Sequence, residues 1–129
     1  MFTIEQINTV HSKVKSGADF PAYIQDLKKM RVLAYETFVS DGHTVYYGDN
    51  NFQMASPAKY AMLLVAGTAN TEEFKTQLAA HQQGKTDYPT FCKDCATSGV
   101  AKWKVVISEM SCIYYDKAGN KILAEQIPG

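Results

Sequence analysis

The apolar positions of this chain switch twice from a helical period to a strand period. In the first quarter, residues three or four apart predict a helix that opens at a capping box of Thr3 and Gln6 and ends at Gly17. Pro21 suits the first turn of a second helix, because its missing amide would have no partner there. We therefore expect two helices before the first change of period.

The strand period begins with residues 32–40, which alternate in their apolar character. Asp41-Gly42 is a hairpin signal, and return strands are expected at 44–48 and 52–54. The apolar run from Tyr60 to Ala66 is interpreted as an extra strand, with a short helix as the alternative, because length alone does not separate the two.

The same order of elements returns in the second half. Asn70 or Thr71 is expected to cap a helix that Gly84 ends, and Pro89 begins another helix that Gly99 closes. Three further strands are expected at 103–108, 111–116 and 121–127.

Residues 19–48 and 87–116 align without gaps at an offset of 87 − 19 = 68 positions, and seven aligned pairs are identical. Unrelated segments would share about two. The identical pairs are Asp19/Asp87, Pro21/Pro89, Asp26/Asp94, Val32/Val100, Ser40/Ser108, Tyr46/Tyr114 and Tyr47/Tyr115. The repeat predicts an α+β fold of two tandem ααβββ copies related by a pseudo-twofold, with helices packed on antiparallel sheet. Within a single domain of residues 1–129, copy 1 would span about 3–54, a connecting segment 55–69, and copy 2 about 70–127.

The two tyrosines of each Tyr-Tyr pair must point to opposite faces of their strand. We expect the second helix of each copy to cover the face with Leu33, Tyr35 and Trp103, and Tyr47 and Tyr115 to share it. The opposite face would then carry an apolar patch that the connecting segment, a second protomer or a ligand should cover. This candidate interaction face consists of Phe38, Tyr46, Val106 and Tyr114.

Cys92 and Cys95 form a C-x-x-C motif just inside a helix start, where a thiol pKa can be lowered. The repeat aligns them with the apolar residues Ile24 and Leu27, so we interpret both as buried core residues. A zinc site is the less favoured reading. Its ligands would be Cys92, Cys95, Cys112 and His81.

Composition limits the partners further. Lysine plus arginine equals aspartate plus glutamate, 13 each, so no global field attracts nucleic acid or anionic lipid. The N-terminal segment lacks the pattern of a signal peptide, the longest apolar stretch is too short to span a bilayer, and three cysteines cannot form a full disulfide framework. We expect a cytoplasmic protein that binds neither nucleic acid nor membrane.

No catalytic motif is present, so we expect a non-enzymatic protein without a cofactor. The leading hypothesis is a module that binds an unknown protein partner or forms a homo-oligomer through the candidate interaction face. One alternative is a thiol-based redox or metal-binding protein. Another is a small-molecule binder with a cleft between the copies, to which Asp26 and Asp94 would contribute polar contacts.

Three segments carry a family resemblance: GADFPAYIQDLKKM, HQQGKTDYPTFCKDCATSGVAKW and YYDKAGNKILAEQIP. They resemble the YdfO-like family of small bacterial and prophage-associated proteins, which are often labelled phage envelope proteins. The resemblance implies an α+β fold and a bacterial source. It implies no activity and no catalytic residues.

Overall fold

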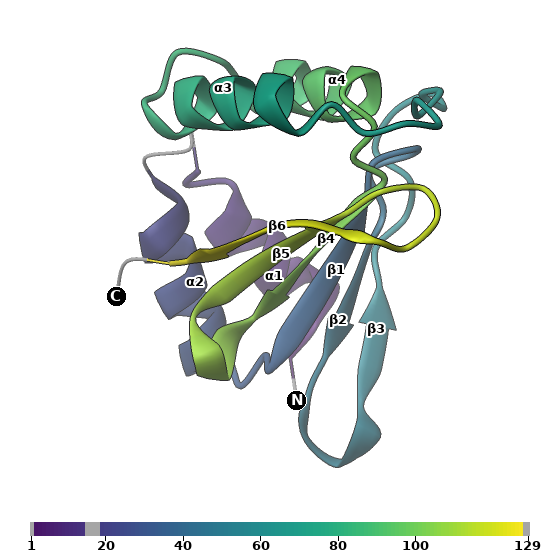
Figure 1. The fold of residues 1–129 in the computed structure, drawn as a ribbon. Helices are drawn as coiled ribbons and strands as arrows, with labels where there is room; N and C mark the ends of the chain where they lie inside the picture. The colour runs from purple at the N-terminus through teal and green to yellow at the C-terminus, as the bar shows by residue number, and fades with distance from the viewer. Residues whose placement is uncertain (1, 15–18, 128–129) are drawn as a thin grey trace.

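The structure, a computed structural model, describes residues 2–14 and 19–127. These residues form an α+β fold of four α-helices, two short 3-10 turns and one six-stranded sheet (Figure 1). The helices are α1 (Ile4–His11), α2 (Phe20–Lys29), α3 (Thr71–Gln82) and α4 (Tyr88–Thr97). The strands are β1 (Ala34–Phe38), β2 (Thr44–Tyr47), β3 (Gln53–Ala55), β4 (Lys102–Val106), β5 (Ser111–Tyr115) and β6 (Lys121–Gln126). The 3-10 turns are η2 (Asp49–Asn51) and η3 (Ile107–Glu109).

The helix ends follow the local signals in the sequence. The Gln6 backbone amide donates to Thr3 Oγ1 at 3.2 Å and the Thr3 amide to Gln6 Oε1 at 2.9 Å, which confirms the predicted capping box of α1. This helix ends at His11, and the predicted end at Gly17 lies outside the described residues. Asn70 is the N-cap of α3, and its side-chain oxygen accepts from the Glu73 amide at 3.1 Å.

Gly99 closes α4 as expected, in a left-handed conformation with φ of +84°. A Cβ at this position would come within 2.6 Å of the Thr68 carbonyl oxygen. Only glycine therefore allows the connecting segment to pass against the end of α4.

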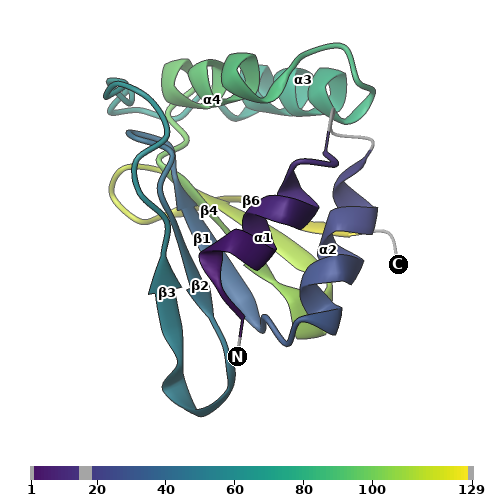
Figure 2. The same cartoon turned by 180° about the vertical axis from the view of Figure 1, so that it is seen from behind.

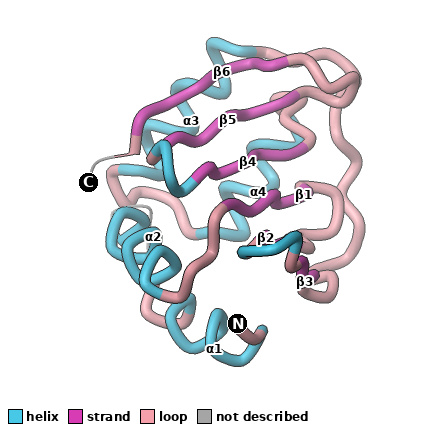
Figure 3. Tube along the Cα trace, turned by 90° about the horizontal axis from the view of Figure 1, so that it is seen from below, coloured by secondary structure: helices cyan, strands magenta, loops and turns pink. Residues whose placement is uncertain are grey.

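The six strands form one antiparallel sheet in the order β3-β2-β1-β4-β5-β6 (Figure 3). The central pairing joins β1 to β4 with Glu36 opposite Lys104. These two residues are 104 − 36 = 68 positions apart, the same offset that aligns the two halves of the sequence. Each half of the chain thus contributes one three-stranded meander to a shared sheet.

All four described helices lie on one face of this sheet. Figure 2 shows α1 and α2 running across the strands, while α3 and α4 cross one end of the sheet. Tyr35 and Trp103 are buried under them, as the repeat predicts. Leu33, expected on the same covered face, is 44% exposed. Within the described residues, no helix combines the length and apolar character needed to cross a membrane.

The connecting segment contradicts both expectations for Tyr60 to Ala66, because it forms neither a strand nor a helix. Its contacts are irregular: the Tyr60 hydroxyl donates to the Val39 carbonyl at 2.6 Å, and the Leu63 amide donates to the Ser40 carbonyl at 2.7 Å. Met62 and Leu64 point into solvent, with 75% and 92% of their surface exposed. The segment follows the end of β1 without adding to the sheet.

A candidate binding cavity under the helices

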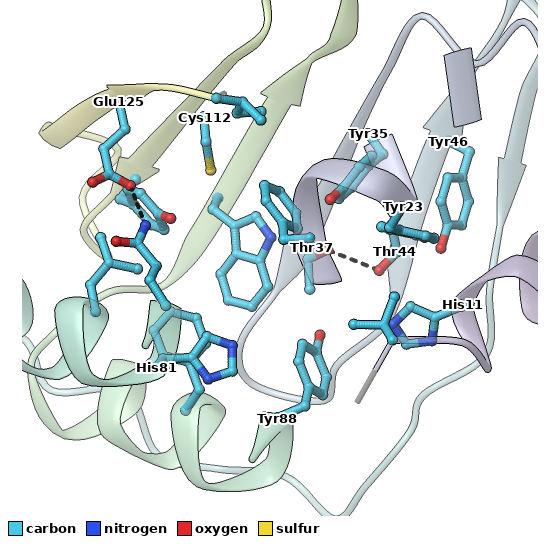
Figure 4. Close-up of a pocket in the computed structure, with 18 of the residues that line it drawn as sticks. His11, Tyr23, Tyr35, Thr37, Thr44, Tyr46, His81, Tyr88, Cys112 and Glu125 are labelled. Atoms are coloured by element: carbon cyan, nitrogen blue, oxygen red, sulfur yellow. Dashed lines mark hydrogen bonds between the residues drawn. The ribbon is translucent and has the colours of Figure 1, made fainter. Parts of the chain in front are cut away.

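A cavity of about 150 Å³ lies between the helix layer and the sheet (Figure 4). All four helices contribute residues to its wall, together with five of the strands and Lys59 of the connecting segment. Because residues from both halves of the chain converge here, the site exists only in the assembled fold.

Counterpart positions of the sequence repeat recur in the wall of this cavity. Six pairs of lining residues that fall within the two copies are separated by 68 positions. They are Val14/Gln82, Phe20/Tyr88, Tyr23/Phe91, Tyr35/Trp103, Thr44/Cys112 and Tyr46/Tyr114. The two halves therefore line the cavity with equivalent positions, although the chemistry differs within most pairs.

Half of the residues in the wall carry an aromatic ring. The His81 ring stacks on Phe91 with centroids 4.2 Å apart and planes inclined by 11°. Phe91 lies 5.6 Å from Trp103, and on the other side Tyr35 lies 5.7 Å from Tyr46. Such a wall favours a planar apolar guest, because ring contacts add to the burial of apolar surface.

A chain of hydroxyl groups crosses the sheet side of the cavity. Thr37 and Thr44 are buried, and their hydroxyl oxygens lie 3.0 Å apart. Either threonine hydroxyl can donate in this contact. The hydroxyls of Tyr23 and Thr44 lie beside the Tyr46 oxygen (Figure 4). Burial raises the pKa of Tyr46, so all these groups stay neutral near pH 7.

Among the polar groups of the wall, the Tyr35 hydroxyl and the Trp103 indole nitrogen have no hydrogen-bond partner in the described part of the chain. Their residues are only 4% and 6% exposed. No fully enclosed side-chain polar atom of the described chain lacks a hydrogen bond, so both atoms must reach the open space of the cavity. Burial raises the pKa of Tyr35 far above its ordinary value, which keeps this hydroxyl a donor.

Two histidines border the cavity from opposite helix pairs (Figure 4). Burial lowers the pKa of His11, and the charge of Lys59 lowers it further. Burial also lowers the pKa of His81, whose Nδ1 lies 3.2 Å from the Thr86 carbonyl oxygen. Both imidazoles are therefore neutral near pH 7, and they present uncharged rings to the cavity.

The candidate interaction face is wrong as predicted, because its four residues do not share a face. Tyr46 is paired directly with Tyr35, which places it on the helix-covered side, and Tyr114 is likewise paired with Trp103. Both tyrosines are buried, at 3% and 6% exposure, and line the cavity. Phe38 and Val106 lie on the opposite, open face, where they are half-buried.

The open face has its own polar centre. Lys102 Nζ lies 2.9 Å from the Glu36 carboxylate, to which the Tyr47 hydroxyl donates at 2.7 Å. The same ammonium lies 5.8 Å from the Phe38 ring and 5.2 Å from the Tyr115 ring. Tyr47 and Tyr115, predicted for the covered face, thus lie on this open face.

The cysteines lie where the repeat predicts. Cys92 and Cys95 are 1% and 0% exposed, and their counterparts Ile24 and Leu27 are both at 0%. Burial raises the pKa of both thiols, so neither is activated by its position near a helix start. Tyr88 lies beside Cys92, although the wall of the cavity does not include that thiol.

The four residues named as zinc ligands are distributed over three elements. Cys112 lies on β5 with Tyr114 beside it, while His81 lies on α3 against Phe91. Burial raises the pKa of the Cys112 thiol to about 12. Over residues 2–14 and 19–127, no group of three or more His, Cys, Asp or Glu side chains is placed to hold a metal ion.

The expected polar contribution of Asp26 and Asp94 to an inter-copy cleft is wrong. Neither residue lines the cavity, and both are half-buried on the helices. Desolvation raises the pKa of Asp94, and the neighbouring Glu73 raises it further. The aspartates lie outside the cavity because the apolar residues of α2 and α4, Tyr23 and Phe91 among them, face the sheet.

The chain belongs to the family described as protein of unknown function (DUF1398), whose sequence pattern matches residues 8–126. A search of curated proteins finds no match. The fold and the cavity therefore define the class: an α+β protein of an uncharacterised family with an aromatic cavity under its helix layer.

Proposed function

We propose that this protein is a non-enzymatic small-molecule binder and that the cavity under its helices receives a planar guest of about one ring. The observation that carries the proposal is the pair of unpartnered donors, Tyr35 and Trp103, in an otherwise aromatic wall. Binding sites commonly combine an apolar surface with a few placed polar groups that fix orientation.

The volume supports a guest of this size. The cavity measures about 150 Å³. Apolar cavities of about that volume hold a single benzene ring. A guest with one hydrogen-bond acceptor would satisfy Tyr35 and Trp103, whose donors otherwise face open space without a protein acceptor.

Titration with benzamide tests this proposal, because Trp103 is the single tryptophan of the chain and its fluorescence reports directly on the cavity. We expect a saturable change in fluorescence. The variant Leu78→Phe adds bulk to the wall and should abolish the response, whereas Ala79→Leu adds bulk to the exposed side of the same helix and should preserve it. An unsaturable response, or equal responses in both variants, contradicts the proposal.

Self-association through the open sheet face is the second candidate function. Half-buried apolar and aromatic side chains favour it. They are Phe38, Val45, Tyr47, Val106, Ile113 and Tyr115. An uncovered face of this kind suits a second copy of the chain. Molar mass by light scattering over a concentration series tests it: a dimer that Ile113→Lys dissociates supports the proposal, and a monomer at every concentration contradicts it.

We further propose that the fold arose from the duplication of an ααβββ unit, with a pseudo-twofold axis passing between Glu36 and Lys104. The paired burial of Ile24 and Cys92 supports it. The double variant Ile24→Cys, Cys92→Ile exchanges the two residues and conserves the total core volume. It should therefore lower the free energy of unfolding by less than about 1.5 kcal/mol. If the double variant loses more free energy of unfolding than the two single variants together, Ile24 and Cys92 do not occupy equivalent environments.

The source and location of the chain complete the proposal. The resemblance to the YdfO-like family supports a prophage-associated bacterial protein. Three unpaired cysteines support a reducing, cytoplasmic location. Fractionation of cells that express the tagged protein tests the location, and recovery in the membrane fraction contradicts it.

A further inference from the structure

The rim of the cavity carries a lysine without a counter-ion. Lys59 lines the cavity and, among the described residues, forms no ion pair with a carboxylate. Lys59 is exposed, whereas Tyr35 and Trp103 deeper in the wall are buried. Lys59 therefore borders the opening of the cavity. The connecting segment fixes its backbone there, because the Lys59 amide donates to the Asp41 carbonyl at 2.8 Å.

The surroundings of this ammonium are apolar or neutral on the protein side. The positive charge of Lys59 acts to lower the pKa of His11 on α1 and that of Cys92 on α4. The ammonium therefore lies between the two helix pairs. Partial desolvation lowers the pKa of Lys59, and no nearby carboxylate offsets that effect. A cation that is partly removed from water and left without an acceptor is a favourable site for an anion.

The carboxylate in the wall lies on the other side of the cavity. Glu125 is on the edge strand β6, and its Oε1 accepts from the Gln82 amide group at 3.0 Å. Lys59 is held at the turn between β1 and β2, which lie on the far side of β4 and β5. The cavity is therefore positive at one end, negative at the other, and supplied with neutral donors in the middle.

We propose that the natural guest is a small aromatic carboxylate, with its ring among Tyr35, Trp103 and Phe91 and its carboxylate at Lys59. This inference rests on the proposed function and specifies the class of ligand. The charge separation sets the orientation, because the reverse placement would bring the carboxylate beside Glu125. The donors of Tyr35 and Trp103 suit acceptor substituents on the ring.

Benzoate and benzamide form the matched pair of probes, since they share size and shape and differ in charge. Each is titrated into the full-length protein near pH 7 at low salt, with Trp103 fluorescence as the readout. We expect benzoate to bind about tenfold more tightly, as a charge-assisted hydrogen bond implies. Lys59→Gln should remove this preference, because it lowers the affinity for benzoate far more than the affinity for benzamide. Lys85→Gln, at an exposed lysine beyond the end of α3, should preserve the preference.

The outcomes separate the two proposals. Equal binding of both probes by the unchanged protein overturns the carboxylate inference and leaves the cavity a binding site. An equal loss of affinity for both probes in Lys59→Gln also overturns the carboxylate inference. The lysine would then support the shape of the cavity and would not bind the carboxylate through its charge. Failure of both probes to bind overturns the inference together with the proposed function.

Discussion

Tyr35 and Trp103 lie 68 positions apart on the two central strands, and each directs a side chain to the same cavity. Each also carries a hydrogen-bond donor for which the described chain provides no acceptor. These two counterparts in the repeat therefore contribute hydrogen-bond donors to the cavity as well as apolar surface to the core. Together they leave two donors for a guest, and this relationship leads to the first prediction.

Removal of the Tyr35 hydroxyl should separate binding from stability. Because this hydroxyl has no protein partner, Tyr35→Phe should change the free energy of unfolding by less than about 0.5 kcal/mol. Its affinity for benzamide should nevertheless fall. Tyr23→Phe is the control, since it removes a hydroxyl that lies beside Tyr46 and should cost about 1 kcal/mol. Urea denaturation and fluorescence titration provide the two measurements. Equal destabilisation by both variants contradicts the assignment.

The hydroxyl groups of Thr37, Thr44 and Tyr46 should contribute unequally to the free energy of unfolding. Thr44→Val removes the middle member and leaves two hydroxyls unsatisfied, so it should cost about 1–3 kcal/mol. Thr37→Val removes a hydroxyl at one end of the group and should cost less. A double-mutant cycle by chemical denaturation should give a coupling energy of about 0.5–1.5 kcal/mol. Additive costs would show that the two threonines do not interact.

The three thiols should be unreactive in the folded protein. With its pKa raised to about 12, Cys112 holds so little thiolate near pH 8 that alkylation should be about a thousandfold slower than for a free cysteine. Cys92 and Cys95 should be slow for the same reason, since burial raises both pKa values. Labelling with iodoacetamide, followed by mass spectrometry, checks this expectation. Rapid modification of Cys92 in the native state would favour the redox alternative instead.

Glu36 at the centre of the open face should make stability depend on acid pH. Burial alone would raise its pKa, but hydrogen bonds from Tyr47 and Lys102 outweigh burial and lower it below 4.5. A carboxylate with a lowered pKa contributes its stability above the unfolded value and loses it as the pH falls through the folded value. The free energy of unfolding should therefore decrease below about pH 4.5. Glu36→Gln should flatten that decrease, and an unchanged pH profile in the variant would contradict the prediction.

Local signals in the sequence predicted the elements well. The capping box of Thr3 and Gln6, the helix closure at Gly99 and the antiparallel strands are all confirmed, because caps, turns and alternation depend on residues close in sequence. The repeat also predicted the burial of Cys92 and Cys95 through their counterparts. The C-x-x-C motif alone did not indicate whether the two thiols are buried, whereas the comparison with Ile24 and Leu27 did.

The sheet face of the tyrosines could not be predicted in the same way. In the segment 44–48 both alternating sets are apolar or aromatic, so the pattern fits either register. The turn between β1 and β2 decides it by pairing Thr37 with Thr44 and so Tyr35 with Tyr46. The cavity was missed for a related reason, since it forms where both helix pairs meet the sheet. The one sequence signal for it was the set of hydroxyl and aromatic residues at counterpart positions.

Isotope-filtered nuclear Overhauser spectroscopy of the protein with bound benzamide tests the central claim most directly. We predict contacts between the ring protons of the probe and the side chains of Tyr35 and Trp103. Contacts confined to Phe38 and Tyr115 on the open face, or no contacts at saturating probe, would contradict a binding site under the helices.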